Sequence, residues 1–411
     1  MMGSGVRLTR KLALIAVLAA GLLCRGPAAG AAQTEAAPRS QRHAAGGCPS
    51  PDGLEAVLAQ ASDWIGQARF QDAALLLKPL AVGDCDPRVS LLLAASLEGQ
   101  ADVPKAIAEL QRAHRVWPSN DSIAASLARD YLAGGDQVKA AQALAHFHVT
   151  ARTPEQEMRM AVVVYLAAHR LQLAESVAAT AYRTYPSIQT LLLFANALQM
   201  QGRYPDVNRL LDSQRANYSG SPDFFVTLAE SEFDASLYQA AHDDLNRALA
   251  LDPGLYQAHY LMGNVLSKLN HPGAAEAEYR KAIDLAPGQP RTYFQLALLL
   301  RTKQDEAGEE QALSQALAVD ERYGPAQCEL GRILLDDRHP AEAVGHLTSA
   351  IQDNPRFEKA YFLLARAYAQ LGERDKSEEV VRQLAAVRKE NQLTPGREMD
   401  DFPDGSPAPQ P

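Results

Sequence analysis

Residues 261–287 read LMGNVLSKLNHPGAAEAEYRKAIDLAP, and this stretch decides the fold. A glycine, Gly263, stands among large apolar residues, another small residue, Ala275, follows twelve positions later, and Pro287 closes the stretch. Apolar residues three and four positions apart form one face of a helix, and proline cannot continue a helix. The stretch therefore predicts two amphipathic helices that are joined by a short polar break and end at the proline.

The small residue at position 263 belongs to a series that runs through most of the chain. Its members are 34 positions apart, except for one step of 33. The series is Ala94, Ala128, Val162, Ala195, Ala229, Gly263, Ala297, Gly331 and Ala365. A fixed period of this length is typical of proteins built from stacked structural repeats. Two helices can cross closely only where one of them lacks bulk, so each small residue should face a neighbouring helix.

The periodic pattern resembles the tetratricopeptide repeat family. That family's motif has a leucine and a glycine in the first helix, an alanine and an aromatic residue in the second, and a closing alanine and proline. Residues 261–287 match it with Gly263, Ala275, Tyr279, Ala282 and Pro287. The resemblance extends from about Leu54 to Asn391. It implies an all-α fold, an α-solenoid of about ten stacked helix-turn-helix hairpins that form a right-handed superhelix.

The two ends of the sequence lie outside this array. Arg7, Arg10 and Lys11 precede an apolar run from Leu12 to Leu23, and small residues follow it. This order is typical of a cleavable signal peptide, here residues 1–31, because the apolar run is too short to span a bilayer. Residues 32–53 are predicted to be a disordered linker, residues 54–391 the repeat array, and residues 392–411 a disordered proline-rich tail.

Export predicts a secreted or periplasmic protein without an integral membrane span in its mature form. An alternative is a lipoprotein anchored through Cys24, although the leucine before this cysteine fits lipoprotein processing poorly. Cys48 lies just before the first helix of the array and Cys85 just after its antiparallel partner. Because the two ends of a helical hairpin are neighbours, we predict a disulfide between them; two unrelated thiols are the alternative.

Composition and motifs argue against several function classes. The formal net charge of −9 disfavours nucleic acid, whose phosphates are bound by clustered lysine and arginine. His339 and His346 are seven residues apart, whereas a zinc pair on one helix needs histidines four apart. The sequence has no glycine-rich phosphate loop and no nucleophile motif. We therefore predict no catalytic residue, no metal site and no cofactor, and hence no enzyme.

The resemblance implies that the first helix of each hairpin lines a concave groove and presents its non-core positions to a partner. Ten residues at such positions are predicted to bind a protein or peptide partner. They are Asn196, Tyr260, Asn264, Arg291, Phe294, Arg301, Arg332, Lys359, Phe362 and Arg366. Five of them are cations, so the groove could bind an acidic or C-terminal peptide segment. In the alternative interpretation, the arginines pair with nearby carboxylates such as Glu329 and Asp336.

Some members of the family grip a terminal carboxylate with three successive repeats, which carry a lysine and an asparagine four residues apart, then an asparagine, then a lysine and an arginine four residues apart. The corresponding positions here carry Tyr260 before Asn264, and Gln295 after Arg291, so a clamp of that kind is not expected. The sequence predicts an exported, non-enzymatic interaction scaffold whose partner and oligomeric state it does not reveal. The alternatives are a recruiting or regulatory subunit of a separately encoded envelope enzyme, such as a glycosyltransferase or peptidase, and a lipid-anchored assembly factor.

Overall fold

The structure, a computed structural model, describes residues 48–150 and 152–393. These residues form twenty α-helices and no strand, which confirms the all-α helical-repeat fold. The predicted signal peptide and nearly all of the predicted tail lie outside the described residues. The first helix begins at Pro51, three residues inside the predicted linker, because Ser50 caps it: the Ser50 hydroxyl accepts a hydrogen bond from the backbone of Gly53.

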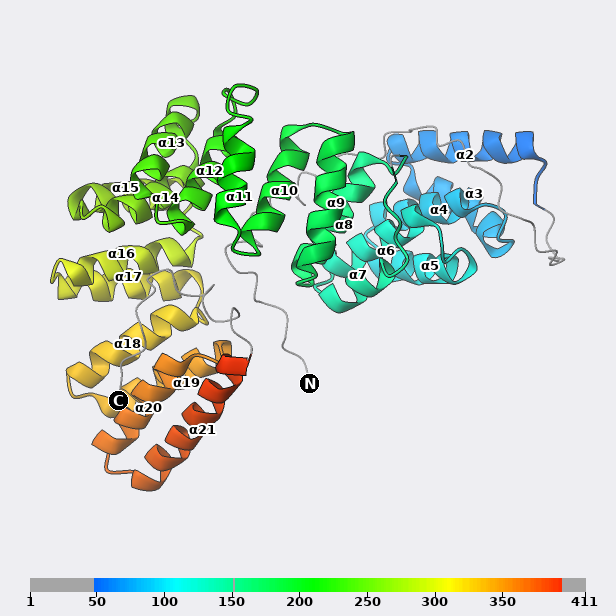
Figure 1. Ribbon diagram of the computed structural model, residues 1–411. Coiled ribbons are helices and arrows are strands. Elements are labelled where there is room, and N and C mark those ends of the chain that lie inside the picture. Colours follow the sequence, from blue (N-terminus) through cyan, green and yellow to red (C-terminus); the bar gives the residue numbers. More distant parts are fainter. Residues whose placement is uncertain (1–47, 151, 394–411) are drawn as a thin grey trace. The chain divides into compact units, whose positions relative to one another are not determined.

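The protein divides into two units, and the division falls between Arg203 and Tyr204. Unit 1 contains four complete helix pairs and one further helix (Figure 1). Its helices are α2 Pro51–Gly66, α3 Phe70–Val82, α4 Pro87–Gly99, α5 Val103–Val116, α6 Asp121–Ala133, α7 Gln137–Ala143, α8 Glu155–Ala167, α9 Leu171–Thr184 and α10 Ile188–Gln199.

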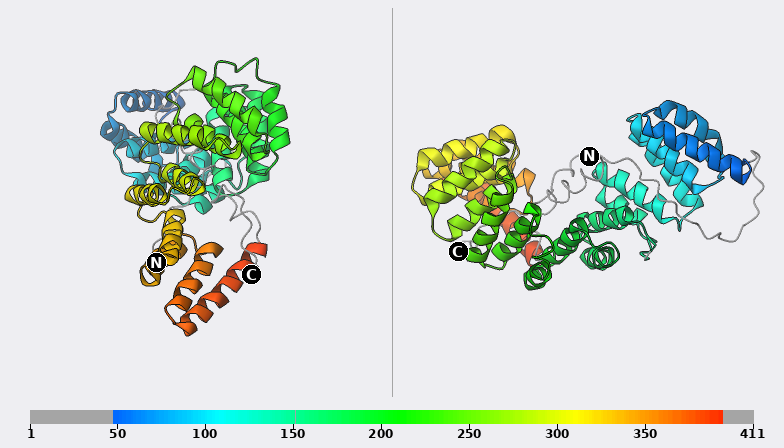
Figure 2. Two further views of the ribbon diagram at one scale, coloured as in Figure 1. Left: turned by 90° about the vertical axis from the view of Figure 1, so that its left-hand side faces the viewer. Right: turned by 90° about the horizontal axis from the view of Figure 1, so that it is seen from above.

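Unit 2 begins with one short helix, which five complete helix pairs follow. Its helices are α11 Tyr204–Asp212, α12 Pro222–Asp234, α13 Tyr238–Leu251, α14 Tyr256–Lys268, α15 Pro272–Leu285, α16 Pro290–Thr302, α17 Glu306–Val319, α18 Gly324–Asp336, α19 Pro340–Asp353, α20 Glu358–Gln370 and α21 Arg374–Leu393. Within each unit, the two helices of a complete pair run antiparallel beside each other (Figure 2).

The small residues of the 34-residue series lie in the core, as the sequence predicts. Every member of the series is buried, from Ala94 in α4 to Ala365 in α20. At the two glycines of the series a side chain of the second helix occupies the space of a Cβ atom. A Cβ atom added to Gly263 would lie 2.6 Å from two ring carbons of Tyr279, and one added to Gly331 would lie 2.6 Å from Cγ of Leu347. The period therefore records where the first helix of a pair meets the second.

Gly263→Ala should destabilise unit 2 by about 1–2 kcal/mol, because overpacking against Tyr279 outweighs the higher helix propensity of alanine. Tyr279 is buried, and its hydroxyl is held by Asn264, so the ring cannot move aside freely. Other pairs place a leucine sixteen residues after an alanine, as in Ala297 and Leu313. Because a leucine side chain can adjust more easily than the Tyr279 ring, we expect Gly263→Ala to cost less in a Tyr279→Leu background. Urea unfolding of the two single variants and the double variant measures this difference, and equal effects in both backgrounds would contradict it.

The turn of each complete helix pair, and the turn between α10 and α11, contains a residue in the left-handed backbone region. Glycine occupies this position at three turns, Gly135, Gly202 and Gly372. At seven other turns the residue carries a side chain: Ala68, Ala101, His169, Ser236, Asn270, Gln304 and Arg338. The backbone N–H of the next residue donates a hydrogen bond to a carbonyl near the end of the first helix. At Asn270, for example, His271 N donates to Leu266 O at 2.8 Å. This bond satisfies a carbonyl at the end of the first helix, and it recurs where the sequence has no glycine to signal it.

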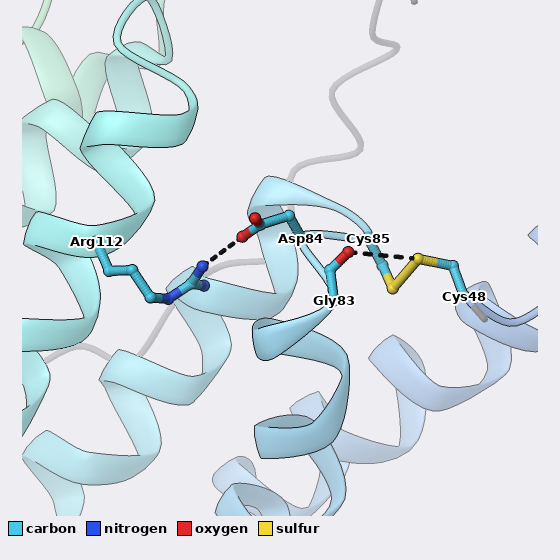
Figure 3. The surroundings of a disulfide bond; sticks show 5 residues. All are labelled: Cys48, Gly83, Asp84, Cys85 and Arg112. Atoms are coloured by element: carbon cyan, nitrogen blue, oxygen red, sulfur yellow. Dashed lines mark hydrogen bonds and ion pairs between the residues drawn. A yellow bond between two sulfur atoms is a disulfide. The ribbon is translucent and has the colours of Figure 1, made fainter. Parts of the chain in front are cut away.

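A disulfide joins Cys48, before α2, to Cys85, after α3, with their Cα atoms 5.5 Å apart (Figure 3). The disulfide therefore links the N-terminal end of α2 to the C-terminal end of α3, opposite the turn that joins the two helices. The connection between α3 and α4, which carries Cys85, is also held to α5, because its Asp84 forms an ion pair with Arg112. Below it, Leu58 and Ala61 of α2 pack with Leu77 of α3 and with α4. The first hairpin is thus attached to unit 1 by one apolar face and fixed at one end by a covalent bond.

Candidate partner-binding surface

The ten predicted partner-binding residues all lie on first helices of their pairs. Asn196 lies on α10 in unit 1, and the other nine lie on α14, α16, α18 and α20 in unit 2. The two units are placed independently, so the structure joins only the nine residues of unit 2 into one candidate surface. These nine differ sharply in exposure and in charge pairing.

Four of the ten side chains are buried, with only 3–4 % of their surface exposed: Asn196, Tyr260, Asn264 and Phe294. Neighbouring aromatic residues cover the last three. The Tyr260 ring lies 6.3 Å from Tyr279, and the Phe294 ring meets Tyr323 edge-on at 5.8 Å. Asn264 accepts a 2.8 Å hydrogen bond from the Tyr279 hydroxyl. Helical spacing placed these residues on the correct helices, but the next helix covers them, so we assign no partner contacts to them.

Four of the five cations belong to a network centred on Glu329 of α18. One carboxylate oxygen, Oε2, accepts from Arg301 Nη1 and Arg332 Nε, both at 2.8 Å, while Oε1 pairs with Lys359. Three helices, α16, α18 and α20, therefore meet at one carboxylate. The side chain of Glu329 is only 5 % exposed. Burial opposes its ionisation, but Lys359, Arg301 and Arg332 outweigh burial and hold the pKa of Glu329 below its ordinary value.

Two further carboxylates complete the network. Arg332 also pairs with Glu309 of α17 and, at 3.2 Å, with Asp336. Asp336 in turn accepts from Arg366 Nη2 at 3.0 Å, which links α18 to α20. Of the two interpretations of these cations, the structure therefore shows carboxylate pairing for four of them. Glu329 and Asp336 were recognisable as partners from the sequence; Glu309 was not, because it comes from the second helix of a pair.

Arg291 of α16 differs from the other cations. Its guanidinium carbon lies 4.5 Å from the ring centroid of Tyr260, and its Nε donates a long 3.4 Å hydrogen bond to the hydroxyl of Tyr256. Within the described residues, no carboxylate oxygen lies at ion-pair distance from it. Sequence analysis missed Tyr256, although its spacing of four residues from Tyr260 places both on one face of α14.

The exposed part of the candidate surface lies on α20. Lys359, Phe362 and Arg366 are three and four residues apart and therefore share one face of the helix. Phe362 is 43 % exposed, which is unusual for a large aromatic side chain in this protein. An exposed aromatic ring between two cations can supply apolar contact area together with charge-assisted hydrogen bonds.

The described part of the protein contains neither a metal-binding cluster nor an exposed free thiol. It contains no group of three or more metal-ligating side chains close enough to hold an ion. The one unpaired cysteine there, Cys328, is fully buried, and burial raises the pKa of its thiol. Among the helices within residues 48–150 and 152–393, none is long and apolar enough to cross a membrane.

Comparison with known proteins agrees with the repeat architecture. The tetratricopeptide repeat family matches residues 226–290, 260–324 and 334–393. Residues 226–324 and 334–393 therefore carry tetratricopeptide repeats, and stacked helix pairs of this kind are those of a protein–protein interaction scaffold.

The similar proteins share only part of their length or sequence with this chain. A tetratricopeptide repeat and J domain-containing co-chaperone from Cryptococcus neoformans is 25% identical over 189 residues, which is 46% of this chain and 32% of the co-chaperone. The chain thus spans about a third of that relative. A solved tetratricopeptide repeat protein from Parabacteroides merdae is 15% identical, with a TM-score of 0.45, and covers 61% of this chain and 99% of its own. Yeast Tom70 is 13% identical, with a TM-score of 0.45, over 85% of this chain and 93% of its own.

Proposed function

We propose that this protein is an exported, non-enzymatic scaffold that binds a protein or peptide partner through unit 2. The observation that carries the proposal is the face of α20, where exposed Phe362 stands between Lys359 and Arg366. Rigid helices present this face, and the ion pairs to Glu329 and Asp336 orient its two cations. A preoriented aromatic and cationic face is suited to a protein surface of opposite charge and needs little ordering when it binds.

Export rests on two independent features. The first is the basic and apolar order of residues 1–31, which is typical of a cleaved signal. The second is the disulfide between Cys48 and Cys85, since such bonds persist in oxidising compartments outside the cytosol. Mass spectrometry of the protein isolated from its source should find a mature form that begins at Ala32. A form that retains Met1 would contradict export, and one that begins with a modified Cys24 would identify a lipoprotein.

Affinity capture from an envelope extract of the source organism tests the binding face. The double variant Phe362→Ala/Arg366→Glu should lose a specific partner that the unaltered protein retains, with at least about tenfold less recovered, because hot-spot contacts concentrate in a few aromatic and arginine residues. The matched control is Val381→Ala/Arg382→Glu, which changes an exposed apolar residue and an exposed arginine on α21.

Equal recovery with both double variants would contradict the assignment to α20. The partner's identity also separates the proposed scaffold from its alternatives. A glycosyltransferase or peptidase recovered in a fixed ratio would identify a recruiting or regulatory subunit.

A further inference from the structure

A cluster of charged residues in unit 2 contains more carboxyl groups than cations. Arg215, in the connection between α11 and α12, donates from Nη1 and Nη2 to the two carboxylate oxygens of Asp244 in α13, at 2.6 and 2.7 Å. The same Nη2 lies 3.7 Å from Oε1 of Glu232 in α12, so two carboxyl groups meet at one guanidinium nitrogen. Asp212 accepts from Arg215 Nε at 2.9 Å, and Arg247 donates to Asp244 at 3.1 Å. Three carboxyl groups therefore share two arginines.

The position of Glu232 disfavours a charge on its carboxyl group. The side chain is only 6 % exposed, and its Oε2 is buried without a hydrogen-bond partner in the described residues. The charged groups that act on it are Asp244, Arg215 and Asp212. Burial, and after it the charge of Asp244, raises the pKa of Glu232 to about 8 although Arg215 opposes the shift. A proton on Glu232 removes the excess negative charge of the cluster and makes this carboxyl group a hydrogen-bond donor.

Unit 1 contains the same arrangement between α4 and α6. Nη2 of Arg129 pairs with Oε1 of Glu98 and, at 2.9 Å, with Oδ1 of Asp130. Asp130 is 4 % exposed, and its Oδ2 is buried with no hydrogen-bond partner in this part of the structure. The charged groups that act on Glu98 are Arg129 and Asp130, so one cation again faces two carboxyl groups. Burial outweighs the attraction of Arg129 and raises the pKa of Glu98 to about 7, and burial also raises the pKa of Asp130.

We propose that each unit holds one structural proton between two carboxyl groups, which are Glu98 and Asp130 in unit 1 and Glu232 and Asp244 in unit 2. With this proton each cluster is electrically neutral, since its remaining carboxylates match its arginines in number. When the proton leaves at alkaline pH, two adjacent carboxylates repel each other in a poorly solvated place. The repulsion weakens the contact between α4 and α6 in unit 1, and in unit 2 the attachment of α13 to the connection before α12. The proposal is independent of export and of any partner.

The variants Glu98→Gln and Glu232→Gln distinguish a shared proton from an ordinary ion pair, because glutamine resembles the neutral form of glutamate. The pKa of each glutamate is higher in the folded protein than the value of about 4.3 in the unfolded chain, so the folded protein binds more protons. The stability linked to these protons is complete below about pH 4.3 and is lost as the pH rises through the folded pKa. The unaltered protein should therefore lose stability as the pH rises, and each variant should lose less.

Urea unfolding of the full-length protein and its variants between about pH 5 and about pH 9 measures this difference. The unfolding equilibrium constant of the unaltered protein, divided by that of a variant, should rise by up to about tenfold per pH unit and level off above about pH 7 for Glu98→Gln and about pH 8 for Glu232→Gln. The matched control is Glu175→Gln. Glu175 pairs with Arg203 at 2.7 Å and is 27 % exposed, against 28 % for Glu98. Its ratio should stay constant over this range, because a carboxylate that is charged in both states releases no proton on unfolding.

Infrared spectroscopy of the unaltered protein in D2O provides a second measurement that needs no variant. A neutral carboxylic acid has a C=O band that an ionised carboxylate lacks, and ordinary aspartate and glutamate are ionised near about pD 6. We expect a carboxylic-acid band at this pD, its loss by about pD 10, and its reduction in each of Glu98→Gln and Glu232→Gln. A ratio that stays constant or falls with pH for these two variants would overturn the proposal. So would a spectrum of the unaltered protein without a carboxylic-acid band near about pD 6.

Discussion

Glu329→Gln should destabilise unit 2 by about 3 kcal/mol, because removing one member of a buried ion pair leaves uncompensated charge. Glu329 is the common partner of Arg301, Arg332 and Lys359, and its carboxylate is almost fully buried. A glutamine offers one acceptor in place of two, and its amide hydrogens would face a cation. We expect a cost near the lower end for buried pairs, because the three cations are partly exposed and can regain water. Urea unfolding measures the loss, and hydrogen exchange should locate it in α16, α18 and α20.

Asp336→Asn provides the matched control for this prediction. Asp336 also joins two arginines, but its side chain is 48 % exposed. Water already screens these pairs, so the expected cost is below about 1 kcal/mol. Equal losses in the two variants would contradict the central role given to Glu329.

The pH dependence of stability gives a second measure of Glu329. Its pKa is lower in the folded protein than in the unfolded state, where the pKa of a glutamate is about 4.3. Its contribution is therefore complete above that value and is lost as the pH falls through the folded pKa. Glu329→Gln should remove this part of the acid-side dependence. If the free energy of unfolding of Glu329→Gln fell with decreasing pH just as that of the unaltered protein does, the ion pairs would not lower the pKa of Glu329.

Removing the disulfide should loosen the first hairpin by about 4 kcal/mol, as the loop-closure relation gives for two cysteines 37 residues apart. The crosslink limits the freedom of the unfolded hairpin, which is the terminal repeat and has a stacking neighbour on one side only. We therefore expect Cys48→Ser/Cys85→Ser to affect local opening more than global unfolding. Hydrogen exchange should accelerate at the amides of α2 and α3, including Leu58 and Leu77, and remain unchanged in α8 and α9.

Two controls accompany the disulfide variant. Unaltered protein treated with a reductant should match the double serine variant, since both lack the same bond. Cys328→Ala should leave exchange in α2 and α3 unchanged, because Cys328 lies in the separate core of α18 to α20. Slow exchange of α2 after reduction would mean that apolar packing alone holds the first hairpin.

The fold was largely readable from the sequence because one spacing recurs in register. Close crossing of two helices favours a small residue on one of them, so the period from Ala94 to Ala365 marks the crossings of the complete pairs from α4 to α21. The division between Arg203 and Tyr204 was not visible, since the series continues at 34 residues from Ala195 to Ala229. A sequence period reports the contacts within a repeat and says less about how firmly one repeat joins the next.

The candidate surface was only partly readable. Helical spacing placed Tyr260, Phe294 and Phe362 on first helices, but it gave all three the same expected exposure. The structure buries the first two and exposes the third, because exposure depends on the side chains of the next helix. The same holds for charge: Arg291 and Arg301 look alike in sequence, yet only Arg301 meets a carboxylate from a helix 28 residues further on.

The sequence by itself determined that the chain forms helix pairs and which residues lie at their crossings, because these depend on spacing along one polypeptide. Only the tertiary structure decided which turns use the left-handed region without glycine, since helix packing at turns such as those of Ala101 and Arg338 holds a conformation that their own residue types disfavour. It also decided that Glu329 gathers three cations while Arg291 pairs with no carboxylate among the described residues. Ion pairs between helices depend on the distance between side chains in space, and no repeat period encodes that distance.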